Sequence, residues 1–247
     1  VVGWGKKGES WGIKKGYIMS APDLPETWER LDDVIDHRYT FKNGQALTIG
    51  ITLVDSGGNH TQDVYKQCRK RKIKRVFAIK GRGGEGIPIV SPAKRVAMKD
   101  NKRVTVWLYT LGVDAGKATI YSNIQVQTPG PKYCHFPTGE DRGYDINYFH
   151  GLISERMVRT KTAGGYKWKW EKLPGHRRNE ALDCRNYALA GVKILDPDFD
   201  AQAQRLKERV KEKAQQMKEE REKRREEARE AVRSMMGDHR FGEAGAK

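Results

Sequence analysis

The sequence predicts an α/β fold in which a mixed sheet is flanked by helices. Residues 47–54 (LTIGITLV) form an apolar, β-branched run that is typical of a strand buried on both faces. Residues 61–71 show the apolar spacing of a helix, and residues 75–80 (RVFAIK) are a second apolar run. Strand, helix and strand in this order indicate a parallel pair of strands joined by a helix.

The segment before this unit predicts a hairpin and a helix. Residues 1–5 are strand-like, residues 6–10 (KKGES) form a turn, and residues 11–19 continue as a second strand. Since the first strand begins at once, we expect the sequence to be part of a longer chain. Pro25 and Glu26 suit a first helical turn, and the apolar residues after them recur every three to four positions, which predicts a helix.

The segment after this unit begins with a loop rich in glycine and proline, residues 81–95 (GRGGEGIPIVSPAKR). The patterns beyond it predict, in order, a strand over 104–109, helices over 114–124 and 146–156, a hairpin over 157–172, and a helix from its N-cap Asn179 to Leu195. Together these elements complete the predicted sheet and its helical cover.

Composition divides the chain into two parts, residues 1–197 and 198–247. From about Asp200 to Met236 there is no Gly or Pro, and Glu recurs with Lys and Arg at helical spacing. Such charge pairs support a solvated helix, whereas the sparse large apolar residues argue against a coiled-coil seam. This helix is either an inert extension or an arm that docks on a partner, and we expect a loose tail after it.

The charge of the chain indicates its class of partner. The net charge is +16 at pH 7, from 48 Lys and Arg against 32 Asp and Glu. An excess of this size favours a polyanion, either nucleic acid or an anionic membrane surface. No stretch reaches the roughly 20 apolar residues that a membrane-spanning helix needs. Nucleic acid is therefore favoured, and the alternative is a basic surface that only keeps the protein soluble.

Two glycine motifs follow predicted strands but fit nucleotide binding poorly. Residues 81–86 satisfy G-x-G-x-x-G, yet the prolines after them oppose the helix that a dinucleotide site requires. This segment is either a basic loop that touches phosphates or a plain surface loop. Residues 112–119 are one residue short of a P-loop, and Ala118 replaces the metal-binding hydroxyl, so we expect no ATP binding. We expect instead a helix start whose Lys117 points to a phosphate or an acidic neighbour.

Carboxylates at two places form a candidate metal site. Asp55 follows the first buried strand, at the edge where open α/β sheets bind ligands, and Gly57 lets the chain turn sharply behind it. The late helix carries Asp183 and, three residues earlier on the same face, Glu180. Oxygen ligands of this kind suit Mg²⁺ or Mn²⁺. The alternatives are that Asp55 only caps the helix starting at Thr61 and that Asp183 is an ordinary surface carboxylate.

Six blocks of the sequence occur in the order in which they stand in a known viral family. They are VVGWGKKGESW, TLVDSGGNHTQDVYKQCRKR, RVFAIKGRGGEGIPIV, GVDAGKATIYSNI, CHFPTGEDRGYDINYFHGLISE and RRNEALDCRNYALAG. In these blocks the chain resembles the nuclease domain of the large terminase subunit of tailed phages, of the lambda type. The resemblance implies a metal-dependent endonuclease with a ribonuclease H-like mixed sheet, which cuts concatemeric viral DNA during genome packaging.

The resemblance also implies roles for single residues. The aspartates of two family motifs fall on Asp55 and Asp183, which we expect to be catalytic metal ligands. The family's Asp-x-x-Lys falls on Asp114 and Lys117, which we expect to support the site together with Ser56. In the family a further aspartate lies upstream of the VVGWG block, on a first strand, and an ATP-binding motor domain lies further upstream. We therefore expect both before the first residue of this chain.

The expected mechanism uses two Mg²⁺ or Mn²⁺ ions, one to activate the attacking water and one to stabilise the leaving 3′ oxygen. Basic side chains are expected along the DNA backbone, at Lys80, Arg82, His176, Arg177 and Arg178. The resemblance implies double-stranded DNA, the small terminase subunit and the portal protein as partners, ATP only in the motor domain, and no membrane. It also implies the cytoplasm of the infected bacterium, outside the mature virion. The alternative function is a non-catalytic fragment that binds DNA or the portal.

Overall fold

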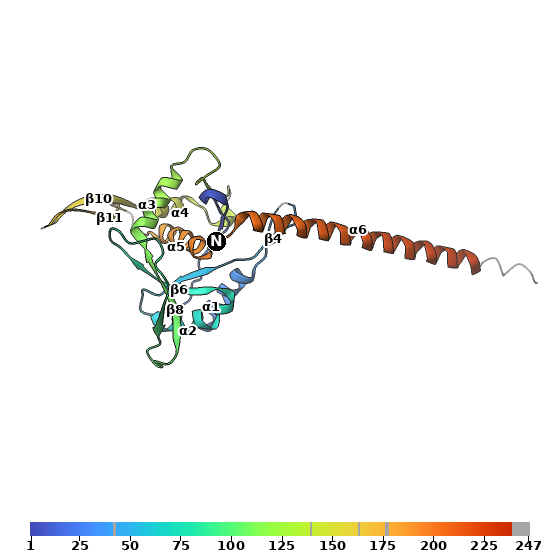
Figure 1. Cartoon of the computed structure of the whole chain (residues 1–247), viewed down its shortest axis with the longest axis horizontal. Helices are drawn as coiled ribbons and strands as arrows, with labels where there is room; N and C mark the ends of the chain where they lie inside the picture. The colour runs from blue at the N-terminus through green and yellow to red at the C-terminus, as the bar shows by residue number, and fades with distance from the viewer. Residues whose placement is uncertain (42, 139, 163, 176–177, 239–247) are drawn as a thin grey trace, which may run out of the picture. The chain divides into compact units, whose positions relative to one another are not determined.

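The computed structural model of the chain describes residues 1–41, 43–138, 140–162, 164–175 and 178–238. The α-helices in this part are α1 (Pro25–Asp36), α2 (Thr61–Lys70), α3 (Val113–Ile124), α4 (Ile146–Leu152), α5 (Glu180–Leu195) and α6 (Phe199–Asp238) (Figure 1). The strands are β1 (Val2–Trp4), β2 (Ser10–Gly12), β3 (Tyr39–Thr40), β4 (Ala46–Leu47), β5 (Thr52–Asp55), β6 (Val76–Arg82), β7 (Lys94–Ala97), β8 (Thr105–Gly112), β9 (Cys134–His135), β10 (Glu155–Thr162) and β11 (Gly165–Lys172). The predicted α/β class is confirmed.

The central sheet has four strands in the order β5-β6-β8-β7. Strands β5, β6 and β8 run parallel, and β7 pairs with β8 in the antiparallel sense, so the sheet is mixed as predicted. Helix α2 joins β5 to β6, which confirms the predicted strand–helix–strand unit. Because Asp55 pairs with Ile79, the end of β5 lies beside the middle of β6.

Helices cover both faces of this sheet (Figure 1). On one face, Val76, Ala78 and Val106 pack in a buried cluster with residues of α1 and α2. On the other face, Ile79 and Leu111 pack against α5. Alternation along β5 and β6 produces this division, since neighbouring strand residues point to opposite faces. Burying an aliphatic side chain of this size stabilises the fold by about 1.5–3 kcal/mol before entropy is counted.

Smaller antiparallel pairs surround the central sheet. The predicted N-terminal hairpin is confirmed in β1 and β2, although its second strand ends at Gly12. Strands β10 and β11 form the predicted second hairpin, in register from Glu155 with Lys172 to Thr162 with Gly165. Figure 1 shows this hairpin extending beyond α3 and α5 at one side of the molecule.

Besides the second strand of the N-terminal hairpin, three predicted elements differ from the structure. The strand predicted over 47–54 begins only at Thr52, because Leu47 pairs with Tyr39 in a separate two-stranded sheet. Strand β5 lies at the edge of the central sheet and is half-buried, whereas we predicted a strand buried on both faces. Strand β7 lies at the end of the predicted loop 81–95 and beyond it. The helix predicted over 146–156 stops at Leu152, and Glu155 already belongs to β10. The last difference matters most, because it decides where the Glu155 carboxylate lies.

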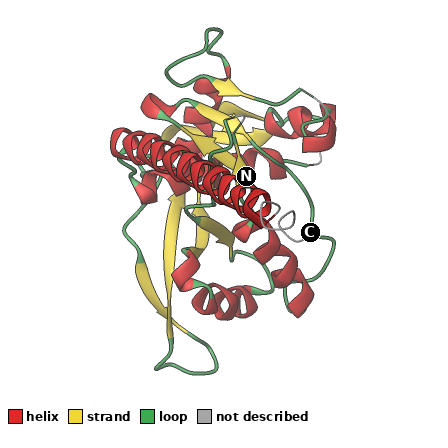
Figure 2. Cartoon of the chain, turned by 90° about the vertical axis from the view of Figure 1, so that its right-hand side faces the viewer, coloured by secondary structure: helices red, strands yellow, loops and turns green. Residues whose placement is uncertain are grey.

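The chain divides into two compact units, one of residues 1–41 and 46–197 and one of residues 42–45 and 198–247. In the second unit α6 is one continuous helix (Figure 2). The side chain of Gln45, from the other segment of this unit, donates a hydrogen bond to the Leu206 carbonyl of α6 at 3.0 Å. The side chains that the structure describes in α6, up to residue 234, are largely exposed, as the predicted solvated helix requires. Among the described helices, none has the length and apolar character that crossing a membrane demands. Residues 239–247 of the predicted tail lie outside the described residues.

Candidate active site

Asp55 is held at the carboxyl end of β5 by contacts from two sides. Its Oδ1 accepts a hydrogen bond from the Gly57 amide at 2.8 Å, and its Oδ2 accepts one from the Tyr187 hydroxyl at 2.9 Å. Any side chain at Gly57 would place its Cβ 3.1 Å from Asp55 Oδ1, so the turn favours glycine at this position. Tyr187 lies on α5, and the carboxylate is therefore fixed between the turn and this helix while staying exposed.

Ser56 supports the end of the strand from inside. Its side chain is 1% exposed, and its hydroxyl donates to the Ile79 carbonyl at 2.8 Å. The Thr61 hydroxyl donates in turn to the Ser56 carbonyl at 2.7 Å. The residue that precedes α2 is His60, and no side chain caps this helix end. Asp55 thus does not serve as a helix cap, which removes the plain alternative for this carboxylate.

Asp183 lies in the first turn of α5, with 31% of its side chain exposed. Partial burial raises the pKa of Asp183 above its ordinary value, and the negative charges of Glu155 and Asp55 add to the rise, whereas Lys117 opposes it. An acid whose pKa is raised by folding opposes folding once ionised, so its contribution to stability falls as the pH rises through that pKa. Ionised Asp183 is therefore kept at a cost to stability, as is common for functional carboxylates.

Glu155 and Lys117 form a buried ion pair beside Asp183. Lys117 Nζ lies 2.7 Å from Glu155 Oε2 and 3.8 Å from Asp183 Oδ1. The side chains of Lys117 and Glu155 are 10% and 5% exposed. The backbone of Glu155 is fixed by the Tyr121 hydroxyl, which accepts from its N–H at 3.2 Å and donates to its carbonyl oxygen. The predicted acidic neighbour of Lys117 is therefore present, and it is Glu155.

Asn179 connects the two acidic groups. It occupies the predicted N-cap position of α5, but its side chain makes no capping hydrogen bond. Its Nδ2 donates to Glu155 Oε1 at 2.8 Å and to Asp183 Oδ2 at 3.0 Å. These bonds, with the Lys117 contacts, make one network from the start of β10 to the first turn of α5. The network fixes the orientation of Asp183.

Close packing of α3 against α5 brings Lys117 to this network. A Cβ atom at Gly116 would overlap the side-chain amide of Asn186, which is 1% exposed and donates to the Val113 carbonyl at 3.0 Å. The absence of a side chain at Gly116 therefore sets the distance between the two helices. Lys117, the next residue, owes its place beside Asp183 to this contact.

We expect Gly116→Ala to destabilise the fold by about 1–3 kcal/mol, the usual cost of overpacking a tight interior contact. Alanine has the higher helix propensity, so any loss of stability must come from the clash with Asn186. Urea unfolding measures the effect. Gly16→Ala is the matched control, because no atom lies within 4 Å of the added methyl group there. Equal stability of the two variants would contradict the packing argument.

Comparison with known proteins identifies the family. The model of the endonuclease domain of the terminase large subunit gpA matches residues 1–205. The chain belongs to this family. It is 36% identical over 199 residues to the terminase large subunit of Escherichia phage lambda and 29% identical over 205 residues to that of Enterobacteria phage P21. In each comparison the match covers 78% of this chain and 30% of the relative.

This chain has no match among solved structures. The ribonuclease H-like form of the sheet therefore stays a prediction, whereas the mixed α/β sheet is observed. The chain spans about 30% of the length of the curated relatives it matches. Membership of the family therefore identifies the domain.

For several residues predicted for the site, the structure shows no bond to Asp55 or Asp183 in the part of the chain that it describes. Asp114 Oδ2 accepts from the Gly84 amide at 2.8 Å, so Asp114 anchors the glycine loop after β6. Glu180 is exposed at the start of α5, where Asn179 rather than Glu180 contacts Asp183. Arg178 is exposed just before α5. The other two basic positions predicted before this helix, His176 and Arg177, lie outside the described residues.

Lys80 and Arg82 lie on the opposite face of the sheet from Asp55. Along β6 they alternate with Ile79 and therefore share the face of Ala78, which packs against α1 and α2. Asp55 and its bonded partner Tyr187 lie on the α5 face. Any contact of Lys80 and Arg82 with DNA at the carboxylates would have to pass around the sheet edge, so their predicted role gains no support.

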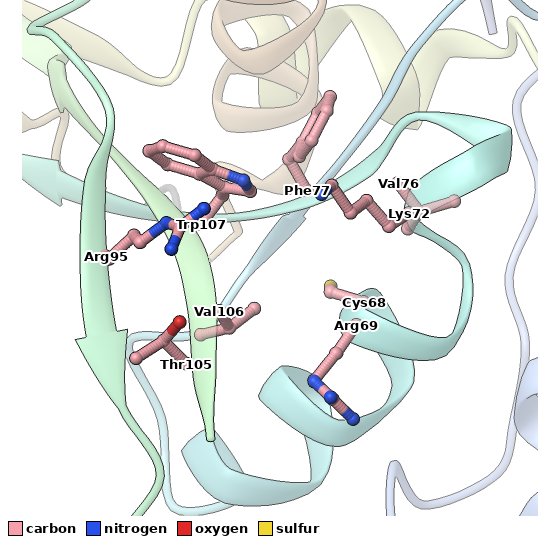
Figure 3. A pocket seen from close by; sticks show the side chains of 9 residues that line it. All are labelled: Cys68, Arg69, Lys72, Val76, Phe77, Arg95, Thr105, Val106 and Trp107. Atoms are coloured by element: carbon pink, nitrogen blue, oxygen red, sulfur yellow. The ribbon is translucent and has the colours of Figure 1, made fainter. Parts of the chain in front are cut away.

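A pocket described in the domain lies away from the carboxylates. It has a volume of about 410 Å³ and lies at the starts of β6 and β8, whereas Asp55 is at the end of β5. Figure 3 shows its lining from α2, the following turn and three strands, with the basic side chains Arg69, Lys72 and Arg95. The Arg95 guanidinium stacks over Trp107, 5.0 Å from the ring centroid. In parallel sheets ligands bind at the carboxyl ends of strands, so we assign the chemistry to the carboxylates.

Sequence reasoning missed three residues of this site, Glu155, Asn179 as a bridge, and Tyr187. Glu155 is the last residue of one of the six sequence blocks shared with the family. It is also the first residue of β10, so these two facts could have pointed to it. Tyr187 follows Asp183 by four positions and so lies on the same face of α5, within reach of a strand end. For Asn179 the sequence holds no signal beyond its position before the helix.

Proposed function

We propose that this terminase nuclease domain hydrolyses phosphodiester bonds of double-stranded DNA at Asp55 and Asp183, using a divalent cation. The observation that carries the proposal is the convergence of a strand-end and a helical carboxylate, in a family of endonuclease domains. Partial burial is the main cause that raises the pKa of Asp183, and the negative charge of Asp55 adds to the rise. Neighbouring carboxylates of this kind favour cation binding.

The donor set suits a hard cation. In the part of the chain that the structure describes, no group of three or more His, Cys, Asp or Glu side chains is placed to hold a metal ion. Asp55 and Asp183 nevertheless provide carboxylate oxygens, and substrate phosphate and water complete such sites for Mg²⁺ or Mn²⁺. When bound, the cation would lower the pKa of water and neutralise charge on the phosphate. A two-ion site needs more carboxylates, and the family resemblance supplies one upstream of the VVGWG block.

The side chains of the domain prepare the two carboxylates for this task. Tyr187 and the Gly57 amide orient Asp55, and Asn179 orients Asp183. Lys117 favours the ionised form of Asp183, which is the form that binds a cation. Glu155 acts through Lys117 as a positioning residue, since it receives the shorter of the two Lys117 contacts. DNA binding itself follows from the net charge of +16.

Nicking of supercoiled plasmid tests the proposal. We expect cleavage with Mg²⁺ or Mn²⁺ and none in EDTA, in this chain or in a longer chain that also carries the residues upstream of Val1. Cleavage that persists in EDTA would contradict the metal dependence. No cleavage by either chain with either metal would contradict the enzymatic proposal altogether.

We expect Mn²⁺ to raise the melting temperature of the domain, because a ligand that binds only the folded state stabilises it. At a concentration 100 times the Kd the gain is about 2.7 kcal/mol. The gain should disappear in Asp55→Asn and in Asp183→Asn, and differential scanning fluorimetry measures it. Asp100→Asn is the matched control, because Asp100 is exposed and pairs with Lys66 away from the site. A shift of equal size in all variants would place the cation elsewhere.

A second candidate function is docking by α6. This helix has 40 residues, and its described side chains are mostly exposed, which favours a role as an arm for a packaging partner. The small terminase subunit and the portal protein are the partners that the family resemblance implies. Co-purification of each with the chain, and with a chain that ends at Pro197, tests this role. Binding that does not need α6 would contradict it.

A further inference from the structure

The hairpin of β10 and β11 carries two exposed faces of unequal chemistry. Each strand has eight residues, and residues 155–172 contain six Lys or Arg and two Glu. The register places three aromatic side chains of β11 and three residues of β10 on one face, in the cross-strand pairs Met157 with Trp170, Arg159 with Trp168, and Lys161 with Tyr166. In two of these three pairs a basic side chain lies opposite an aromatic one, and we call this face the aromatic face.

The aromatic face is open except at its base. Tyr166 and Trp168 are 58% and 54% exposed, whereas Trp170 packs on Tyr121 at a ring distance of 5.0 Å. The Arg159 guanidinium lies over the Tyr166 ring, 4.0 Å from its centroid, so this cation is already ordered. Exposed aromatic side chains beside cations suit a nucleic acid, because the rings can contact bases or sugars while the cations contact phosphates.

The base of the hairpin is part of the candidate active site. Glu155, the first residue of β10, bonds Lys117 and Asn179, and its cross-strand partner is Lys172. Asn179 Nδ2 also donates to Asp183 Oδ2 at 3.0 Å, so the Asn179 side chain links the first pair of the hairpin to this carboxylate. A molecule bound along the hairpin therefore lies with one end beside Asp183.

We propose that the β10–β11 hairpin binds the DNA duplex beside the scissile phosphate, with the aromatic face against a groove. This inference rests on the proposed function, since it takes DNA as the substrate. The major groove admits a two-stranded ribbon, and eight strand residues span about 27 Å, close to one helical turn of DNA. Arg159 and Lys161 contact phosphates, and Trp168 and Tyr166 contact sugars and base edges.

Binding of a fluorescent duplex in EDTA tests the proposal without any cleavage. We expect the double variant Arg159→Ala and Lys161→Ala to bind at least about tenfold more weakly at 150 mM salt, and its slope of log K against log salt to fall by about 1.8. The matched control is Lys102→Ala with Arg103→Ala, which removes the same charge from the exposed loop between β7 and β8. The control should keep most of the affinity. An equal loss in both double variants would overturn the proposal.

Three further variants separate a specific contact from loss of structure. Arg159→Lys with Lys161→Arg keeps both charges and should keep the salt slope. Trp168→Ala should weaken duplex binding about fivefold or more, and Trp168→Phe should restore most of it. Normal duplex binding by Trp168→Ala and the double alanine variant, or a loss confined to single-stranded DNA, would overturn the proposal. Since no metal is present, these outcomes do not depend on whether Asp55 and Asp183 cleave DNA.

Discussion

Replacing Asp183 by asparagine is expected to abolish DNA cleavage, with a loss of at least about 100-fold, comparable to removing one group that stabilises transition-state charge. The substitution keeps the shape of the side chain and an oxygen that can accept from Asn179, but it removes the charge that holds a cation. Asp55→Asn should have a similar effect while Tyr187 keeps a bonding partner. The measurement is the initial rate of plasmid nicking with Mn²⁺.

Stability separates this loss from unfolding. Because burial and neighbouring charges raise the pKa of Asp183, its ionised form opposes folding above that pKa. Asp183→Asn should therefore be at least as stable as the parent at pH 7 and should lose this advantage at acid pH, where Asp183 is protonated. Asp100→Asn serves again as the control and should cleave normally. Unchanged cleavage by both Asp55→Asn and Asp183→Asn would refute the site.

Glu155→Ala is expected to lower the free energy of unfolding by about 3–5 kcal/mol, because it leaves the charge of Lys117 buried without its nearest partner. Cleavage should fall as well, since Lys117 would no longer be held beside Asp183. Urea unfolding and plasmid nicking measure the two effects. Few single substitutions in a domain of this size exceed this loss of stability.

The hairpin itself offers the matched control for this experiment. Glu171 pairs with Lys169 at 2.6 Å, but these side chains are 43% and 52% exposed. Glu171→Ala should therefore cost less than about 1 kcal/mol. The double variant Lys117→Met with Glu155→Met should regain most of the stability, because no buried charge remains, and should still lack normal cleavage. A loss in Glu155→Ala no larger than in Glu171→Ala would contradict the buried pair.

Much of the fold could be predicted because its signals are local. The apolar run before Asp55, the helical spacing of α2 and the turn at Gly165 each specify one element through neighbouring residues. The two candidate carboxylates could be chosen from the sequence for the same reason. Asp55 ends a strand and Asp183 begins a helix, and both positions follow from element boundaries.

The rest of the site depends on contacts between distant segments. Residues 146–156 show apolar spacing that a helix can continue, and only the pairing of Glu155 with Lys172, far along the chain, draws the last residues into a strand. From its position in the sequence, Asn179 is expected to cap a helix. Only the fold brings Glu155 and Asp183 beside it, and its side chain donates to both carboxylates. The sequence placed Lys80 correctly near the carboxyl end of a strand. Side chains alternate between the two faces of the sheet along β6, and this alternation puts Lys80 on the face opposite Asp55. A shift of one residue along the strand would move the side chain to the other face of the sheet.

The unbroken course of α6 also sets a length. Its 40 residues rise about 1.5 Å each, which makes a rod of about 60 Å. A protein bound at its last turn is therefore kept at a nearly constant spacing from one bound at its first turn. The backbone hydrogen bonds of the helix provide that stiffness. Charge pairs such as Lys223 with Glu227, 3.9 Å apart, add a small stabilisation, and concentrated salt weakens it.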